Sequence, residues 1–405
     1  MEAEIEFIPS GTVTSPEGFH AGGTYAGIKE ESDEALDLGI LFSEAPCVAA
    51  AVFTKNRIKA APVILTRRRL RSGRALAVVI NSGCANACTG KRGFKDAVKI
   101  AELAAKGLGI LPKDVLVSST GLIGKRLPMR RIQDSIDQII LSRDGGYRLT
   151  RAIMTTDTMA KETAVAVEAA ESRFTIGGIA KGSGMIHPDM ATLLCFLATD
   201  AAVDIGYLKS ALKRAVDNSF NMVSIDGDTS PNDTVLIMAN GMAGNKPITK
   251  HSELAGAFQQ ALDQVCVSLA KYVARDGEGA SKLIEVTVAG APNTAQARLA
   301  ARAVVSSPLL KAAVHGSDPN WGRVMAAVGR SGAKVIEAKM DLYLGDICVV
   351  RAGQPLPFNK RSLKRTFSGS EVPITIQLNL GTATATAWGC DLSEEYVTIN
   401  SDYTT

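Results

Sequence analysis

Thr192 is the residue whose type and surroundings most favour chemistry. It lies between a glycine-rich turn and an apolar run that predicts a buried strand, in K-G-S-G-M-I-H-P-D-M-A-T-L-L-C-F (Lys181 to Phe196). A threonine hydroxyl needs a base, and an α-amine with a pKa of about 7.7–8.0 serves when threonine begins a chain. Thr192 Oγ could expose that amine by attacking the Ala191 carbonyl, forming an ester that water hydrolyses. Spacing alone favours an ordinary β-branched residue that starts a strand.

Acyl chemistry also needs hydrogen-bond donors for the negative oxygen of its intermediate. The segment S-S-T-G-L-I-G, residues 118–124, follows a predicted strand and offers hydroxyls and a glycine N–H that can approach a reacting carbonyl closely. An ordinary turn is the alternative interpretation of the same residues.

Three further polar segments could supply binding groups. R-D-G-E-G-A-S-K, residues 275–282, places Glu278 in a glycine-lined loop between a long helix and a strand. D-P-N-W-G-R, residues 318–323, predicts a turn followed by a helix. N-S-D-Y-T-T, residues 400–405, follows the aromatic stretch W-G-C-D-L-S-E-E-Y-V, which predicts that this segment is held in place rather than frayed.

Several well-known motifs fail on spacing. G-L-I-G-K-R at residues 121–126 lacks the phosphate-loop pattern, and G-S-G-M at 182–185 is too short for a dinucleotide-binding turn. A Ser-His-Asp triad is conceivable, but no G-x-S-x-G is present, and we interpret His187, next to a proline, as a structural turn residue. Cys84 and Cys88 lack the partner pair of a zinc site, so we expect no metal. The seven scattered cysteines fit free thiols.

Composition predicts a large soluble globular protein. The chain has 405 residues, 46% of them apolar and 21% charged, with no apolar run that approaches a membrane span. A net charge of +4 is too small on this length to suggest nucleic-acid binding. The N-terminal M-E-A-E-I-E-F lacks a secretory or transit pattern, so we expect a cytoplasmic location.

One local basic cluster stands out against this balance. It could hold an anionic ligand such as a nucleotide-bearing cofactor, or it could be a solvated helix end. Its members are Arg67, Arg68, Arg69, Arg71 and Arg74.

Both strands and helices are predicted to position these residues. Strands are predicted at 75–80, 115–118, 193–197, 234–238 and 283–288, and period-two alternation predicts another over 374–380 that continues into T-A-T-A-T-A. An apolar stripe over 254–273 and a second pattern over 207–218 predict helices. Because a regular β-α-β rhythm is missing, we expect layered α+β packing.

Taken together, these segments resemble the ornithine acetyltransferase family, also called glutamate N-acetyltransferase, of the cyclic arginine pathway. The resemblance covers nearly the whole chain, and many motifs in order make it highly specific. The matching motifs are A-A-V-F-T-K-N, N-S-G-C-A-N-A-C-T-G, S-S-T-G-L-I-G, K-G-S-G-M-I-H-P-D-M-A-T-L-L, S-I-D-G-D-T-S-P-N-D-T, D-G-E-G-A-S-K, G-S-D-P-N-W-G-R and Y-V-T-I-N-S-D-Y-T-T.

The resemblance implies an α/β (α+β) layered sandwich like that of the autoprocessing aminopeptidases. It implies cleavage between Ala191 and Thr192, which divides the chain into an α chain, 1–191, and a β chain, 192–405, assembled as a heterotetramer or larger. Thr192 then takes the acetyl group of N-acetylornithine and passes it to glutamate by ping-pong transfer. Some members also use acetyl-CoA as donor, and no bound cofactor is implied.

The resemblance also implies roles for particular residues. Thr120 and Gly121 match the oxyanion hole. The substrate-contact positions are Thr155, Lys181, Thr192, Glu278, Asn400 and Thr405. A lysine and hydroxyls suit a substrate carboxylate, and Glu278 suits the ornithine ammonium.

Two other classes remain in competition. An autoprocessed N-terminal-nucleophile amidase or aminopeptidase would use the same threonine but pass the acyl group to water. An uncleaved binding protein would keep the fold without the chemistry.

Overall fold

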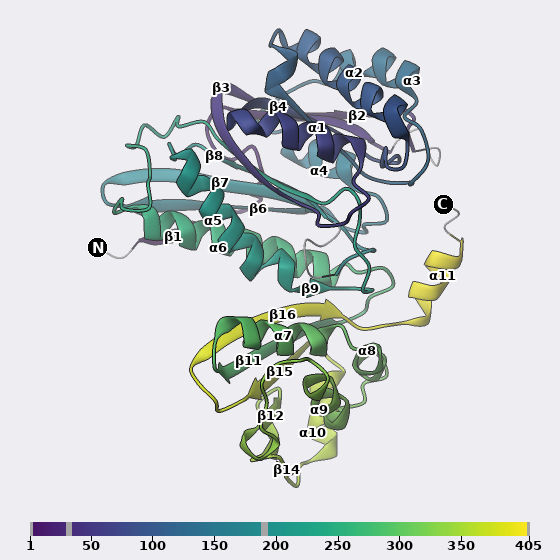
Figure 1. Ribbon diagram of the computed structural model, residues 1–405, viewed down its shortest axis with the longest axis vertical. Coiled ribbons are helices and arrows are strands. Elements are labelled where there is room, and N and C mark those ends of the chain that lie inside the picture. The colour runs from purple at the N-terminus through teal and green to yellow at the C-terminus, as the bar shows by residue number, and fades with distance from the viewer. Residues whose placement is uncertain (1–2, 30–34, 188–192, 403–405) are drawn as a thin grey trace.

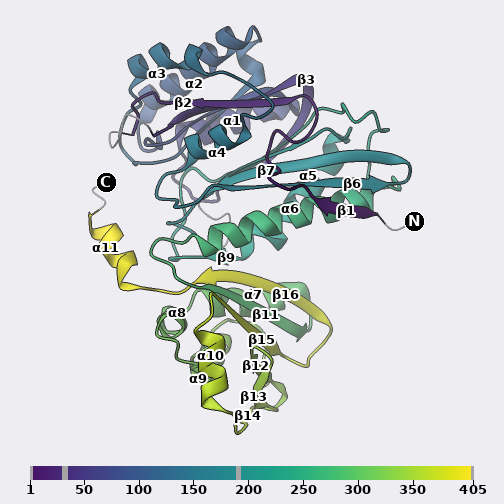
Figure 2. The ribbon, with the colours of Figure 1, turned by 180° about the vertical axis from the view of Figure 1, so that it is seen from behind.

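Two β-sheets and the helices between and around them build the molecule (Figure 1). The computed structural model describes residues 3–29, 35–187 and 193–402. Seen from the opposite side, the C-terminal helix lies beside both sheets rather than within either (Figure 2). The predicted layered α/β (α+β) sandwich is confirmed.

The first sheet contains nine of the described strands. Its spatial order is β1-β6-β7-β8-β10-β3-β4-β5, and β2 also pairs with β3. The strands are β1 (Glu4–Phe7), β2 (Phe19–Thr24), β3 (Leu38–Phe53), β4 (Arg74–Asn81), β5 (Val115–Ser119), β6 (Lys161–Ala169), β7 (Ser172–Lys181), β8 (Leu194–Thr199) and β10 (Thr234–Ala239).

The centre of this sheet is made by β8 and β10, which are parallel to each other. Every residue of both strands is buried, as expected for apolar strands covered on both faces. β8 pairs with β7 on one side, and β10 pairs with β3 on the other. The second half of the chain therefore fills the middle of a sheet whose flanks come from the first half.

The second sheet contains seven described strands in the order β14-β13-β12-β15-β11-β16-β9. They are β9 (Val223–Ser224), β11 (Leu283–Ala291), β12 (Asp341–Leu344), β13 (Ile347–Arg351), β14 (Gln354–Pro355), β15 (Glu371–Gln377) and β16 (Ala383–Cys390).

Helices cover both faces of the first sheet (Figure 1). One face carries α1 and α2, and the other carries α5 and α6, which also reaches the second sheet. The helices are α1 (Ala61–Arg69), α2 (Gly90–Leu108), α3 (Met129–Ser135), α4 (Gly146–Ile153), α5 (Ile205–Asn218), α6 (Ala255–Arg275), α7 (Thr294–Val305), α8 (Pro308–His315), α9 (Trp321–Gly329), α10 (Lys360–Phe367) and α11 (Glu394–Asp402).

One apolar core joins the two sheets through α6. Val165 of β6, Leu269 of α6 and Val286 of β11 are all fully buried in the same cluster. The apolar stripe predicted over 254–273 faces this core, since each of its members is buried. The helix α6 therefore acts as the shared layer that fixes one sheet relative to the other.

The predicted elements are largely confirmed, with one error. The expected strands at 75–80, 115–118, 193–197, 234–238 and 283–288 appear as β4, β5, β8, β10 and β11. The alternation over 374–380 does not continue into T-A-T-A-T-A, because β15 ends at Gln377 and the chain turns at Asn379, which has a φ of +53°. β16 then pairs on the other side of β11.

Within the described ranges, no helix combines the length and the apolar character needed to cross a membrane.

Candidate active site

The loop after β5 is shaped by a glycine that no other residue can replace without a clash. Gly121 has a φ of +121°, and a Cβ there would lie 2.4 Å from the Gly83 carbonyl carbon and 2.6 Å from the Cys84 nitrogen. The preceding Thr120 donates its N–H to the Asn81 carbonyl at 2.9 Å. Among the described residues the Gly121 N–H meets no acceptor, so it is available to a ligand.

Lys181, the last residue of β7, connects this loop to a second one. Its Nζ donates to Thr155 Oγ1 at 2.7 Å and to Thr120 Oγ1 at 3.4 Å. The side chain is buried, and burial lowers the pKa of Lys181 although the nearby Asp157 carboxylate opposes the shift. The result is a buried amine set among hydroxyls, suited to an anionic group of a small substrate.

A cluster of buried charged side chains lies next to Lys181. Asp157 accepts hydrogen bonds from Lys161 Nζ at 2.6 Å, from the Gly182 N–H at 2.7 Å and from the Thr155 N–H at 2.9 Å. Lys161 also pairs with Asp276 at the end of α6. Burial raises the pKa of Asp157, but Lys181 and Lys161 together outweigh it and hold that pKa below its usual range.

Glu278 contacts both the loop that carries Thr156 and the turn that follows Lys181. Its N–H donates to the Ser183 carbonyl at 2.8 Å, and its Oε1 accepts from Thr156 Oγ1 at 2.7 Å. A Cβ on Gly184 would lie 2.5 Å from the carboxylate, so a larger residue there would push the Glu278 side chain out of its position. Asn400 of α11 donates its Nδ2 to Glu278 Oε2 at 2.9 Å, which ties the C-terminal helix to the site.

The structure therefore brings together five of the predicted site residues from four segments of the chain. These are Thr120, Gly121, Thr155, Lys181 and Glu278, with Asn400 attached through Glu278. The predicted cleavage residues Ala191 and Thr192 and the predicted contact Thr405 lie outside the described residues.

The described neighbour of Thr192 is already part of the sheet. Leu193 accepts a hydrogen bond at its carbonyl from the Thr234 N–H at 3.1 Å. Lys181 and Leu194 are partners in the register of β7 and β8. Leu193, to which Thr192 is bonded, therefore lies at the same end of the sheet as Lys181.

Sequence reasoning missed Asp233, which lies beside Leu193. Its side chain is fully buried, and neither carboxylate oxygen meets a donor among the described residues. Burial raises the pKa of Asp233 well above its usual value. The motif S-P-N-D-T contained the residue, but only the fold shows that its carboxyl lies in the interior.

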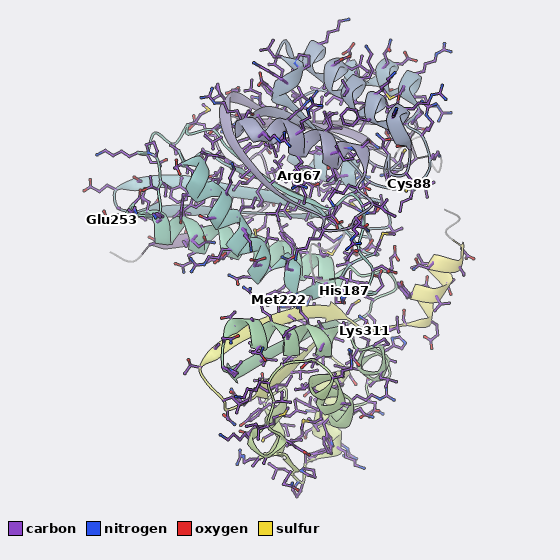
Figure 3. All side chains as sticks on the ribbon, in the orientation of Figure 1. Arg67, Cys88, His187, Met222, Glu253 and Lys311 are labelled. Carbon is purple, nitrogen blue, oxygen red and sulfur yellow. The ribbon has the colours of Figure 1, made fainter. Side chains whose placement is uncertain are left out.

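Histidine has no place in this cluster among the described residues. His187 contacts Ser224 Oγ at 3.2 Å, while His315 contacts Asp391 at 2.9 Å and Glu394 at 3.3 Å. In Figure 3 His187 lies between the first sheet and β16. In the described part of the chain, no three His, Cys, Asp or Glu side chains gather closely enough to hold a metal ion.

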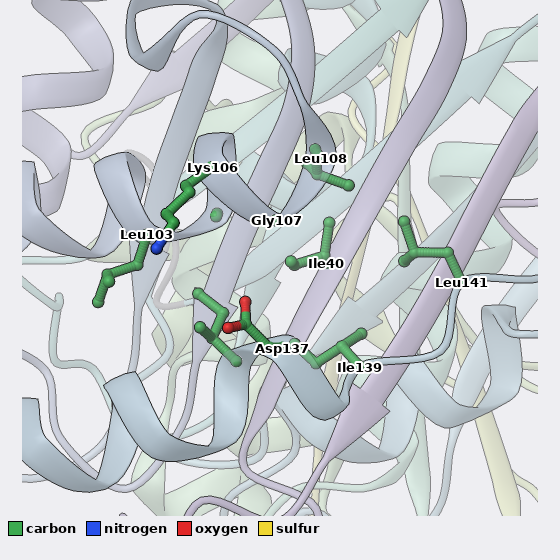
Figure 4. Close-up of a pocket in the computed structure, with 10 residues that line it drawn as sticks. Ile40, Leu103, Lys106, Gly107, Leu108, Asp137, Ile139 and Leu141 are labelled. Atoms are coloured by element: carbon green, nitrogen blue, oxygen red, sulfur yellow. The ribbon is translucent and has the colours of Figure 1, made fainter.

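A mostly apolar pocket beside the first sheet is separate from the site. It has a volume of about 510 Å³ and lies between α2 and the segment after α3 (Figure 4). Its walls include Ile40, Leu103, Ile139 and Leu141, and none of its described lining residues belongs to the polar cluster.

A positioned lysine, hydroxyls, a glycine N–H and a carboxylate around one strand end define a site suited to acyl transfer. The chain belongs to the ArgJ family, whose profile matches residues 20–405. The predicted family membership is confirmed.

Three similar proteins illustrate the match. The arginine biosynthesis bifunctional protein ArgJ of Dehalococcoides mccartyi (strain CBDB1) is 50% identical over 405 residues, covering all of both chains. The crystal structure of the Bacillus halodurans protein of that name is 41% identical, with a TM-score of 0.50, and covers 50% of this chain and 96% of its own. Ornithine acetyltransferase from Mycobacterium tuberculosis, complexed with ornithine, is 41% identical, with a TM-score of 0.42, and covers 47% of this chain and 100% of its own.

Proposed function

We propose that this protein is an acyltransferase of arginine biosynthesis that moves an acetyl group from N-acetylornithine to glutamate. The observation that carries the proposal is the convergence of Lys181, the Thr120–Gly121 loop and Glu278 at the end of β7, beside the start of β8. Family membership supports the same activity.

The first half-reaction forms an ester on Thr192. Its Oγ attacks the acetyl carbonyl while its α-amine takes the proton, and the Gly121 N–H and Thr120 hydroxyl stabilise the oxyanion. Collapse of the intermediate breaks the amide bond, and the ammonium returns its proton to the departing ornithine amine. Glutamate then attacks the ester with its own amine, which gives N-acetylglutamate and restores the threonine.

The polar groups around the loop orient the two amino acids. Lys181, with the Thr155 hydroxyl, binds the substrate carboxylate, and Glu278 binds the side-chain ammonium of ornithine. Asn400 holds Glu278 in place from α11. We assign Thr405 to the same substrate contacts.

Thr192 becomes an N-terminus by self-cleavage after Ala191. Support comes from chain length, because 96% of the solved Bacillus halodurans chain matches only 50% of this one. The α chain, 1–191, and the β chain, 192–405, remain associated, and we propose a heterotetramer in the cytoplasm. Acetyl-CoA serves as a second acetyl donor.

The experiment that tests the proposal is an intact-mass spectrum before and after addition of N-acetylornithine. We expect two chains with the masses of 1–191 and 192–405, and a β chain that gains one acetyl group. Thr192→Ala should remove cleavage and transfer together, since one hydroxyl serves both, while Thr192→Ser keeps a hydroxyl as the matched control. A cleaved Thr192→Ala protein would overturn the scheme.

A second measurement separates transfer from hydrolysis. An amidase would release acetate from N-acetylornithine whether or not glutamate is present. The transferase should form N-acetylglutamate in amounts that match the ornithine released. Acetate as the main product in the presence of glutamate would favour the amidase.

A further inference from the structure

The first sheet has an open edge next to the candidate active site. β4 pairs with β3 only as far as Val48, whereas β10 pairs with β3 up to Phe53. The Ala49 N–H donates to the Gly73 carbonyl at 2.9 Å, toward the β4 side. Because these directions alternate along a strand, the N–H groups of Ala51 and Phe53 point the same way. Because the pairing with β4 ends at Val48, no described strand lies beside Ala51 and Phe53 on that side of β3.

A pocket of about 600 Å³ lies along this open edge. That volume is within the range of small-molecule sites. Ala49 to Phe53 and Leu70 give it a mostly apolar wall, and none of its described lining residues carries a carboxylate. Its cations come from the end of β3, from α1 and the turn after it, and from α5: Lys55, Lys59, Arg67, Arg71 and Lys209.

Only some arginines of the basic cluster seen in the sequence line this pocket. Arg67, on α1 (Figure 3), and Arg71 line the pocket, while Arg68 and Arg74 do not. Arg69 donates to the Val115 carbonyl and so serves the packing of α1 on β5. Within the described chain the exposed Arg67 and Arg71 have no ion pair, so both guanidinium groups are available to an external anion.

The pocket also lies at the end of the sheet where the chemistry is proposed. Thr54, part of its lining, donates its N–H to the Asp233 carbonyl at 3.0 Å. In the register, Phe53 pairs with Thr234, and Thr234 with Leu194. Two strand spacings, about 10 Å, therefore separate the pocket edge from the strand that follows Thr192.

We propose that this pocket binds the phosphate groups of an acyl-bearing nucleotide thioester, the chemical class of acetyl-coenzyme A. This proposal rests on the proposed function, because it places the second acetyl donor at the same nucleophile. With the phosphates on the five cations and the open-edge N–H groups, the thioester extends toward Thr192. Thr192 Oγ forms the new bond to the acetyl carbon, the C–S bond breaks, and the thiolate takes the proton held by the α-amine.

The test compares two double charge reversals of equal size. Arg67→Glu/Arg71→Glu changes the pocket, and Arg68→Glu/Arg74→Glu changes exposed neighbours that do not line it. Because each charge-assisted contact contributes substantially to binding, the pocket variant should raise the Kd for adenosine 3′,5′-bisphosphate and the KM for acetyl-coenzyme A at least about tenfold. The control should change both less than about threefold. Equal losses in the two variants, or no loss in either, would overturn the proposal.

Two further arms identify the ligand. Adenosine 3′,5′-bisphosphate should compete with acetyl-coenzyme A and leave the KM for N-acetylornithine unchanged. Binding without competition would mean that the pocket takes a free nucleotide effector, which overturns the assignment to the acyl donor.

Calorimetric titration of coenzyme A into the Thr192→Ala protein separates this proposal from the proposed function. Pocket-dependent binding there, with no transfer from N-acetylornithine in the unsubstituted protein, would support the pocket and reject the transferase. Active transfer without coenzyme A binding would reject the pocket alone.

Discussion

Gly121 shows how a single backbone position can shape a catalytic loop. Its positive φ turns the chain after β5, and its missing side chain lets the loop lie against Gly83. Both requirements are met by glycine alone. The nearby Gly124 also has a positive φ, of +83°, but nothing lies within 4 Å of its Cβ direction.

We predict that Gly121→Ala lowers kcat by a factor of about 10²–10³, because the displaced loop misplaces an oxyanion donor. The backbone clash should also cost about 3 kcal/mol of stability. Gly124→Ala, the control, should cost about 1 kcal/mol and keep most of the activity. Chemical denaturation and initial-rate assays measure both effects. Similar kcat values for the two variants would remove Gly121 from the catalytic loop.

At the residue scale, the sequence revealed residues inside recognisable motifs and missed those that only the fold brings close. Lys181 and Glu278 could be assigned because their segments resemble a known family. Lys161 could not, because a lysine at the start of K-E-T-A-V-A-V resembles a solvated strand end, while the structure buries it completely. Its partner Asp276 is more than one hundred residues away in the sequence.

At the scale of elements, the ion pairs of Lys161 fasten β6 to α6 and to the Thr155–Thr158 loop. Lys161 and Asp157 have no exposed side-chain surface, and Asp276 has 4%. A buried charge that loses its partner is far more costly than an exposed one. Lys161 therefore contributes to the stability of the loop that carries Thr155.

We predict that Lys161→Met destabilises the fold by about 3–5 kcal/mol, since it leaves Asp276 buried without its cation and Asp157 with Lys181 alone. Lys213→Met, which breaks an i,i+4 pair with Asp217 on the surface, should cost less than about 1 kcal/mol. Equilibrium denaturation in urea compares the two. Equal losses would show that the buried cluster has no special weight.

The same substitution should change the dependence of stability on pH. The pKa of Asp157 is lowered in the folded state, so its contribution is present above the unfolded value of 3.8 and is lost as the pH falls through the folded value. Lys161→Met removes one cause of that shift. The stability difference between variant and parent should therefore be largest at neutral pH and narrow below about pH 4.

Element types were largely predictable because apolar periodicity marks buried faces, as in α6 and β8. Connections were less so. The alternation of β15 and the small residues of β16 looked continuous, yet a turn sends the second strand to the far side of β11. Period-two patterning shows which residues share a face but not which neighbour a strand pairs with.

At the scale of the whole molecule, the two proposed chains share one sheet. β8 and β10 come from 192–405 and lie between β7 and β3, which come from 1–191. Separating the chains would expose two pairs of strand edges and a core that also includes α5 and α6.

We predict that the cleaved chains elute together in size-exclusion chromatography without denaturant. They should separate in about 6 M guanidinium chloride, which unfolds even very stable domains. The uncleaved Thr192→Ala protein is the control, because it elutes as one chain in both conditions. Separation in native buffer would contradict the shared-sheet arrangement.

Because β8 and β10 lie between β7 and β3, the folded state of the cleaved protein is harder to regain than that of the uncleaved chain. Before the proposed cleavage, folding is a unimolecular event, because β7 and β8 belong to one chain and only about a dozen residues separate them. After it, the same state can be regained only by the meeting of two separate polypeptides, each with unpaired edges, so recovery becomes dependent on concentration and competes with aggregation. The mature enzyme would thus be assembled once and then persist by the slowness of its unfolding, and its lifetime in the cell would be set by that rate.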